Sequence, residues 1–183
     1  DGKDTYSGPT EHGLRNTKMN NAALDVSYAL SDDWKLSAYY SYGKRSLNSG
    51  HSTGYDADLT DTANSFGAGV SGKLTGQLRV GADLFWLNDK LTYNQSLDAL
   101  NTNATNTALI NGGGLPDVNY KLTRLKLYGE YAVQKNAYVR LDYIYNHSFF
   151  NEWTYQYNGI PYLYSDNTII TAKQTQNVNF LGA

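Results

Sequence analysis

Apolar and polar residues alternate with a period of two along most of the chain, in six runs followed by a seventh that begins near residue 177. Successive side chains of a β-strand point to opposite faces, so each run predicts a strand with one apolar and one polar face. The runs are about ten residues or longer, which is the length that a tilted strand needs to cross a bilayer. The apolar positions are Leu24, Val26, Tyr28, Leu30, Leu36, Ala38, Tyr40, Tyr42, Phe66, Ala68, Val70, Leu74, Leu78, Val80, Ala82, Leu84, Trp86, Leu125, Leu127, Tyr131, Val133, Val139, Leu141, Tyr143 and Tyr145.

The connections between the runs alternate between short and long. Tight turns at one edge of a sheet and long loops at the other are typical of outer-membrane β-barrels, in which the turns are periplasmic and the loops external. A sheet that only encloses a soluble core has no reason to sort its connections by length. The expected turns are 31–33, 75–77 and 134–136, and the expected loops are 48–60, 95–117 and 154–176.

The polar faces of the predicted strands carry charged residues, which would be costly in a dry core. That face must therefore be wet or covered by a polar partner, as the lumen of a barrel is. Opposite charges on neighbouring strands predict cross-strand pairs such as Glu130 with Arg140. A soluble antiparallel sheet with one wet face would alternate in the same way, but strand length, loop sorting and tyrosine placement favour a membrane barrel. The charged residues expected in the lumen are Arg79, Asp83, Arg124, Lys126, Glu130, Arg140 and Asp142.

Composition agrees with a barrel, since the 183 residues include 17 Tyr and 3 Trp but only 5 Phe. Tyrosine and tryptophan concentrate at membrane interfaces. Trp34 is expected in the periplasmic aromatic girdle, and Tyr42, Tyr93, Trp153, Tyr155 and Tyr157 are expected where strands emerge on the long-loop side. No run approaches the ~18 apolar residues of a helical span, so helical insertion is excluded. The net charge of -2 gives no indication of nucleic-acid binding.

The residues give little support to catalysis or metal binding. The absence of cysteine excludes disulfides, thiolate metal sites and haem attachment. His12, His51 and His147 each lack a second ligand at a metal-site spacing. Residues 56–61 resemble a calcium loop only loosely, because its glycine and terminal glutamate are missing; a solvated acidic loop is the expectation, with weak calcium binding as the alternative. We expect no catalytic, cofactor-binding or metal-binding residue in this chain, and no enzymatic activity.

The domain organisation follows from where the alternation begins. Residues 1–21 are polar without a strand period and are expected to form an external loop segment. Residues 22–183 are expected to form transmembrane strands with short periplasmic turns and long extracellular loops. Seven strands are fewer than the eight of the smallest single-chain barrels, and an open sheet would leave backbone groups unpaired in lipid. The expected fold is all-β: a partial, about seven-strand, C-terminal segment of a larger antiparallel up-and-down transmembrane barrel.

Several segments resemble the C-terminal end of the MtrB/PioB family of outer-membrane barrels that associate with decahaem cytochromes. The resemblance covers residues 115–183, and the hairpin spacing is similar over 22–93. The segments that carry it are LPDVNY at 115–120, LKLYGEYA at 125–132, KN at 135–136, VRLDY at 139–143, Trp153, YSD at 164–166 and QNV at 176–178.

The resemblance implies a sheath that encloses a multihaem c-type cytochrome and forms an electron conduit across the outer membrane. The implied partners are a periplasmic decahaem cytochrome inside the barrel, an extracellular multihaem cytochrome on the outer loops, and outer-membrane lipid. The haem would belong to the partner, and the seven lumen charges would contact it. Clustered exposed tyrosines favour protein contact, so Tyr155, Tyr157, Tyr162 and Tyr164 are candidates for docking the external cytochrome. The alternatives are a general porin or substrate channel and a soluble β-sandwich binding module.

Overall fold

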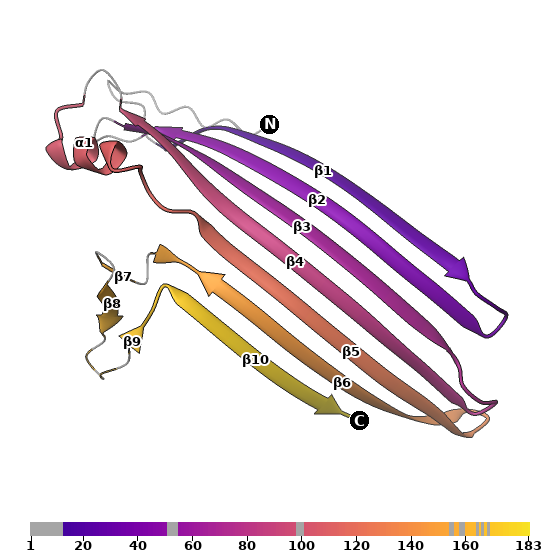
Figure 1. Ribbon diagram of the computed structural model, residues 1–183. Helices are drawn as coiled ribbons and strands as arrows, with labels where there is room; N and C mark the ends of the chain where they lie inside the picture. The colour runs from indigo at the N-terminus through magenta and orange to yellow at the C-terminus, as the bar shows by residue number, and fades with distance from the viewer. Residues whose placement is uncertain are drawn as a thin grey trace.

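The computed structural model describes residues 13–50, 55–97, 101–153, 156–157, 160–163, 165, 167 and 169–183. Its main feature is one long antiparallel sheet in which each strand pairs with the next along the chain (Figure 1). The strand order is β1-β2-β3-β4-β5-β6-β10, an up-and-down meander. Such an open sheet is the arrangement of part of a β-barrel wall. The strands are β1 (Gly13–Ala29), β2 (Trp34–Gly50), β3 (Tyr55–Lys73), β4 (Leu78–Leu97), β5 (Val118–Gln134), β6 (Ala137–Asn151) and β10 (Lys173–Gly182).

The tight turns lie together at one end of the sheet, and the additional elements lie at the other (Figure 1). Thr75 Oγ1 accepts hydrogen bonds from the backbone N–H of Gln77 and Leu78, which closes the turn between β3 and β4. At the opposite end are helix α1 (Ala104–Asn111) and a small sheet of β7 (Gln156–Tyr157), β8 (Ile160–Leu163) and β9 (Ile169–Ile170). The expected sorting of turns and loops is therefore confirmed for the connections that follow β4 and β6.

Helix α1 begins at a polar cap and ends at glycines. The side chain of Asn103 accepts hydrogen bonds from the N–H groups of Thr105 and Asn106, which is the usual stabilisation of a helix start. Gly113 and Gly114 have φ values of 103° and 76°, a backbone conformation that favours glycine and ends the helix. Leu115 N–H then donates to Gln95 Oε1 at 2.8 Å, which ties this connection to β4.

The register of the ladder fixes which side chains share a face, because residues paired across antiparallel strands point to the same side. One row crosses the whole sheet at mid-height, and its members are aliphatic or aromatic on six of the seven strands. The two faces predicted from alternation are therefore confirmed; we call this one the outer face and the opposite one the inner face. The row comprises Val26, Ala38, Ala68, Leu84, Leu125, Tyr145 and Asn179.

The apolar side chains of the outer face form a belt of limited height. On β2 the belt runs from Trp34 to Tyr42, which is about 27 Å along the strand and roughly 20 Å after a barrel's usual tilt. Tyr28, Trp34 and Tyr131 lie towards the tight turns, and Tyr40, Tyr42 and Trp86 lie towards the opposite end. Aromatic rings thus border the belt on both sides, as they do in outer-membrane barrels.

The sheet is a single layer without a hydrophobic core. Within the described residues the only buried apolar side chains are Ala57, Val118 and Ala172, and no large side chain is fully buried. Belt residues such as Leu24 and Leu84 remain 64% and 45% exposed. A β-sandwich would cover this face with a second sheet. Here no second sheet covers the belt in the described part of the chain, so its apolar side chains require an apolar medium such as lipid hydrocarbon.

None of the helices in the described part of the chain has the length and apolar character needed to span a membrane.

Two expectations about strand ends are wrong. Residues 13–21, assigned from sequence to an external loop segment, belong to β1. Most of the expected loop at 48–60 is also strand, because β2 extends to Gly50 and β3 begins at Tyr55. Above the apolar belt the outer face of these strands is polar and the inner face is mixed, with Leu47 and Leu59 beside Arg45 and Asp61, so the alternation that marks the belt is lost although the backbone ladder continues. Residues 1–12 and 51–54 lie outside the described residues.

Candidate functional site

The charged residues predicted to line the lumen all lie on the inner face. Arg79 pairs with Glu130, and Glu130 pairs with Arg140, so these three form one row across β4, β5 and β6. The next rows hold Asp142 beside Tyr128 and then Asp83 beside Lys126. Arg124 lies above them and donates from Nε to Asn146 Oδ1 at 2.8 Å. The charges thus form a patch on the half of the sheet that is nearer the tight turns.

Arg140 is the centre of this patch. Its Nε and Nη2 donate to the two carboxylate oxygens of Asp142 at 2.7 and 3.0 Å, a bidentate arrangement between residues two apart on β6. Its Nη1 lies 3.7 Å from Glu130 Oε2, which confirms the cross-strand pair expected from the sequence. Lys126 Nζ lies 3.5 Å from Asp142 Oδ1. The charges of Arg140, Asp142, Glu130 and Lys126 are therefore paired with one another within the wall.

Aromatic side chains of the inner face lie flat against the sheet where they cover glycines, so they project less into the space in front of the wall. A Cβ on Gly81 would lie 2.3 Å from Cε1 of Tyr128, and a Cβ on Gly67 would lie 2.2 Å from Cε1 of Tyr39. The Tyr39 ring continues into an offset stack with Phe85, with centroids 6.3 Å apart and planes at 28°. Side chains that lie along the wall leave the space in front of it open. This flattening could not be inferred from the alternation of residue types.

Arg79 and Asp83 differ from Arg140 in having no ion-pair partner among the described residues. Both side chains are exposed on the inner face. Two opposite charges that the wall itself does not neutralise can make ionic contacts with a polar body placed against it. Together with Arg124, which also makes no ion pair among the described residues, they are the members of the predicted set that are best suited to contact a partner.

Nearer the long-loop end, the inner face carries contacts that the sequence reasoning missed. Arg45 Nη2 lies 2.9 Å from Asp61 Oδ2, an ion pair between β2 and β3. Asp61 belongs to the stretch 56–61, which was expected to be an acidic loop but lies in β3. Cross-strand charge pairing was the signal that could have identified Arg45 and Asp61, but it requires the register of strands that were assigned to a loop.

Two residues expected in the external aromatic girdle have another role. Tyr93 and Trp153 pack edge to face, with ring centroids 6.0 Å apart. Tyr93 pairs with Leu59 on the inner face, so it does not project towards lipid from the belt. Tyr42 does lie at the outer-face border of the belt, as expected.

The tyrosines expected to dock an external partner lie in the connection between β6 and β10. Tyr157 is in β7 and Tyr162 is in β8, two strands that pair with each other at the long-loop end of the molecule. Tyr155 and Tyr164 lie outside the described residues. The topology therefore brings two of the four positions into one small sheet.

Metal-ligating side chains do not gather within the part of the chain that the structure describes, where three or more His, Cys, Asp or Glu never come together. His147 lies within β6, and its Nδ1 is 2.7 Å from Asn177 Oδ1. Asp58 accepts a hydrogen bond from Asn48, and Asp61 pairs with Arg45. His12 and His51 fall outside the described residues. The chemistry that the described inner face offers is ionic, polar and aromatic contact.

Comparison with known proteins gives one family. A family model described as an outer membrane beta-barrel porin, MtrB/PioB, matches residues 1–183. A search of curated proteins gives no match. The match covers the whole sequence and agrees with the up-and-down sheet, the apolar belt and the charged inner face. The chain belongs to the MtrB/PioB family of outer-membrane β-barrel porins.

Proposed function

We propose that this chain forms part of the wall of a barrel that sheathes a multihaem c-type cytochrome, so that electrons cross the outer membrane through the enclosed haems. The wall provides a lipid-compatible exterior and a polar interior for a cargo that cannot cross lipid unaided. The chain itself carries no redox group and catalyses no reaction in this proposal.

The observation that carries the proposal is the inner face itself. Tyr39 and Tyr128 lie flat over glycines, so the wall leaves room for a large body. Arg79 and Asp83 present charges that no described neighbour neutralises. A flat surface with unpaired charges of both signs suits a protein cargo, which presents charges of both signs in return.

The enclosed cytochrome can be tested by purifying the barrel from outer membranes in mild detergent. We expect a haem-staining protein to copurify, to resist added protease while the barrel is folded, and to be released when the barrel is denatured. A barrel that is free of haem and conducts ions in a planar bilayer would instead support the general porin or substrate channel.

The contact residues can be tested by reversing one inner-face charge. Arg124→Glu is expected to lower the amount of retained cytochrome, because Arg124 faces the lumen next to Phe85 and Asn146. Lys135→Glu makes the same charge change in the exposed turn between β5 and β6 and serves as the control. Equal retention in both variants would remove Arg124 from the contact surface.

We also propose that the connection between β6 and β10 docks an extracellular multihaem cytochrome through its tyrosines. Tyr157 and Tyr162, in the paired strands β7 and β8, lie at the end of the sheet away from the tight turns. Deleting residues 156–163 should weaken binding of the external cytochrome while the barrel and its internal cytochrome stay assembled. Unchanged binding would contradict this part of the proposal.

A further inference from the structure

Above the apolar belt, the outer face changes from aliphatic to basic. One row of paired residues crosses all seven strands of the sheet two residues beyond the Tyr42 row, and it contains three lysines and no carboxylate. We call it the lysine row. Its members are Asn20, Lys44, Thr62, Lys90, Asn119, Asn151 and Lys173.

Two further lysines flank this row on the same face. Lys121 lies one row nearer the belt, in the row that contains Tyr42, and Lys18 lies one row farther away. All five lysine side chains are exposed. The lysines therefore occupy three successive rows, about 13 Å along the strands and roughly 10 Å along the membrane normal after tilt.

The positive charge of this zone is largely uncompensated. Lys90 pairs with Asp117 at 2.6 Å. Lys18, Lys44, Lys121 and Lys173 make no ion pair within the described part of the chain. At the same height, carboxylates lie on the opposite face of the sheet: Asp61 and Asp89 point inward. The lysines of this zone thus lie on the side that carries the apolar belt, whereas Arg45, on the inner face at this height, is paired with Asp61.

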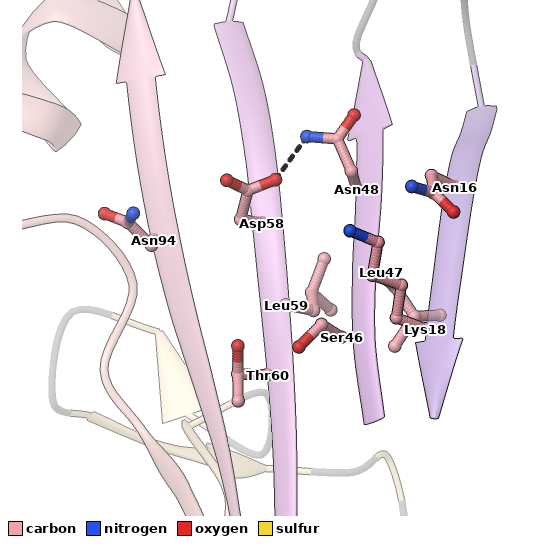
Figure 2. A pocket seen from close by; sticks show the side chains of 9 residues that line it. All are labelled: Asn16, Lys18, Ser46, Leu47, Asn48, Asp58, Leu59, Thr60 and Asn94. Carbon is pink, nitrogen blue, oxygen red and sulfur yellow. Dashed lines mark hydrogen bonds between the residues drawn. The ribbon is translucent and has the colours of Figure 1, made fainter. Parts of the chain in front are cut away.

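A shallow polar hollow of about 470 Å³ lies next to the lysine row on the outer face (Figure 2). The side chains that line it come from β1, β2, β3 and β4, and Asn48 donates a hydrogen bond to Asp58 at its centre. The amides, the hydroxyls and the carboxylate of Asp58 can form hydrogen bonds with the hydroxyl groups of sugars. The lining residues are Asn16, Lys18, Ser46, Leu47, Asn48, Asp58, Leu59, Thr60 and Asn94.

We propose that the lysine row and its flanking lysines bind the phosphorylated headgroups of outer-leaflet glycolipid, with the polar hollow accepting the adjoining sugars. The acyl chains would then lie against the apolar belt directly below. Lysines at the edge of a hydrocarbon layer extend their charged ends towards the headgroups while their stems remain on apolar surface. The zone is on the end of the sheet opposite the tight turns, which is the external end in outer-membrane barrels. This binding does not depend on the enclosed cytochrome.

The test measures binding of diphosphoryl lipid A to the barrel purified from outer membranes in detergent. Lys44→Gln/Lys173→Gln should weaken that binding about 30-fold, because each lysine near an anionic surface contributes about 1 kcal/mol and two are removed. The control is Lys35→Gln/Lys73→Gln, which removes two lysines from the inner face near the tight turns. The control should bind lipid A as the unmodified barrel does, and both doubles should show the gel mobility of a folded barrel.

Two further probes identify the chemistry. Lipid A from which the phosphates have been removed should bind much more weakly, and millimolar inorganic phosphate should compete poorly because it lacks acyl chains for the belt. Equal binding of lipid A by the two double variants would overturn the proposal, as would equal binding with and without the phosphates. If Lys44→Gln/Lys173→Gln keeps lipid A but loses a copurifying protein, the zone is a protein-docking surface and the proposal fails.

Discussion

The guanidinium carbon of Arg140 lies 4.2 Å from the centroid of the Tyr128 ring, a cation–π contact between β6 and β5 on the inner face. The ring is held flat because it covers Gly81 on β4. Asp142 and Glu130 then hold the guanidinium in place over the ring. Gly81 on β4 therefore determines, through the Tyr128 ring on β5, where the guanidinium of Arg140 on β6 can lie.

Gly81→Ala is expected to destabilise the barrel by about 1–3 kcal/mol, since an added methyl group must displace the ring in a packed contact. The new Cβ would lie 2.3 Å from Tyr128 Cε1. Urea titration of the folded barrel in lipid vesicles, followed by the mobility difference between folded and unfolded protein on gels, measures the change. Gly129→Ala is the matched control, because a Cβ at Gly129 would have nothing within 4 Å. Equal midpoints for the two variants would contradict the packing argument.

The assignment of faces predicts opposite results for two adjacent residues of β2. Ala38 lies at the middle of the apolar belt, and Ser37 points to the inner face in the row of Asp83. Ala38→Arg should cost roughly 2–4 kcal/mol, as arginine does at the lipid-facing midplane of barrels, whereas Ser37→Arg should cost much less. Unfolding of both variants in vesicles makes the comparison. A larger loss for Ser37→Arg would reverse the faces.

Salt should reveal how Arg140 contributes to stability. The side chain is about one-third exposed, so its contacts with Asp142 and Glu130 are screened by ions. Arg140→Gln should lower the urea midpoint at low ionic strength, and the difference from the unmodified barrel should shrink in 1 M salt. A difference that stays constant with salt would indicate that packing against Tyr128, rather than charge, accounts for the effect.

The sequence predicts the strands and their faces where the wall meets hydrocarbon. There one face must be apolar and the other polar, so the positions of residues such as Leu84 and Asp83 are encoded by alternation alone. The same logic predicts that Glu130 meets Arg140, because facing positions on neighbouring strands follow once the three-residue turn at 134–136 is identified. Each of these inferences uses only a period of two and one tight turn.

The strand ends could not be predicted in this way. Lys18 and Asn48 lie above the belt, where the outer face is polar and the inner face mixes apolar residues such as Leu47 with charged ones, so the apolar-out alternation of the belt is absent. The ladder continues there because backbone pairing does not depend on side-chain polarity. The sequence pattern of residues 13–21 and of most of 48–60 therefore predicts loops, although these residues form strands.

The side-chain contacts of the inner face could not be predicted from the sequence either. Arg140 takes Asp142, two residues along its own strand, as its closest partner. The position of the Tyr128 ring depends on the absence of a side chain at Gly81, which only the register reveals. These local contacts determine which charged side chains of the described inner face, such as that of Arg79, remain available to a partner.

On the outer face, Tyr143 and Asn179 should stabilise each other because both are polar groups within the apolar belt. The hydroxyl of Tyr143 on β6 donates to Asn179 Oδ1 on β10 at 2.8 Å. Tyr143→Phe leaves that oxygen without its donor and should cost about 1–3 kcal/mol, the usual penalty for an unsatisfied polar group in apolar surroundings. Tyr143→Phe/Asn179→Leu removes both partners and should recover most of the loss. Tyr128→Phe, which removes a hydroxyl from the wet inner face of β5, is the control and should change the urea midpoint in vesicles little. If the double variant is less stable than Tyr143→Phe, the amide of Asn179 has another essential partner and the pair is not the stabilising unit.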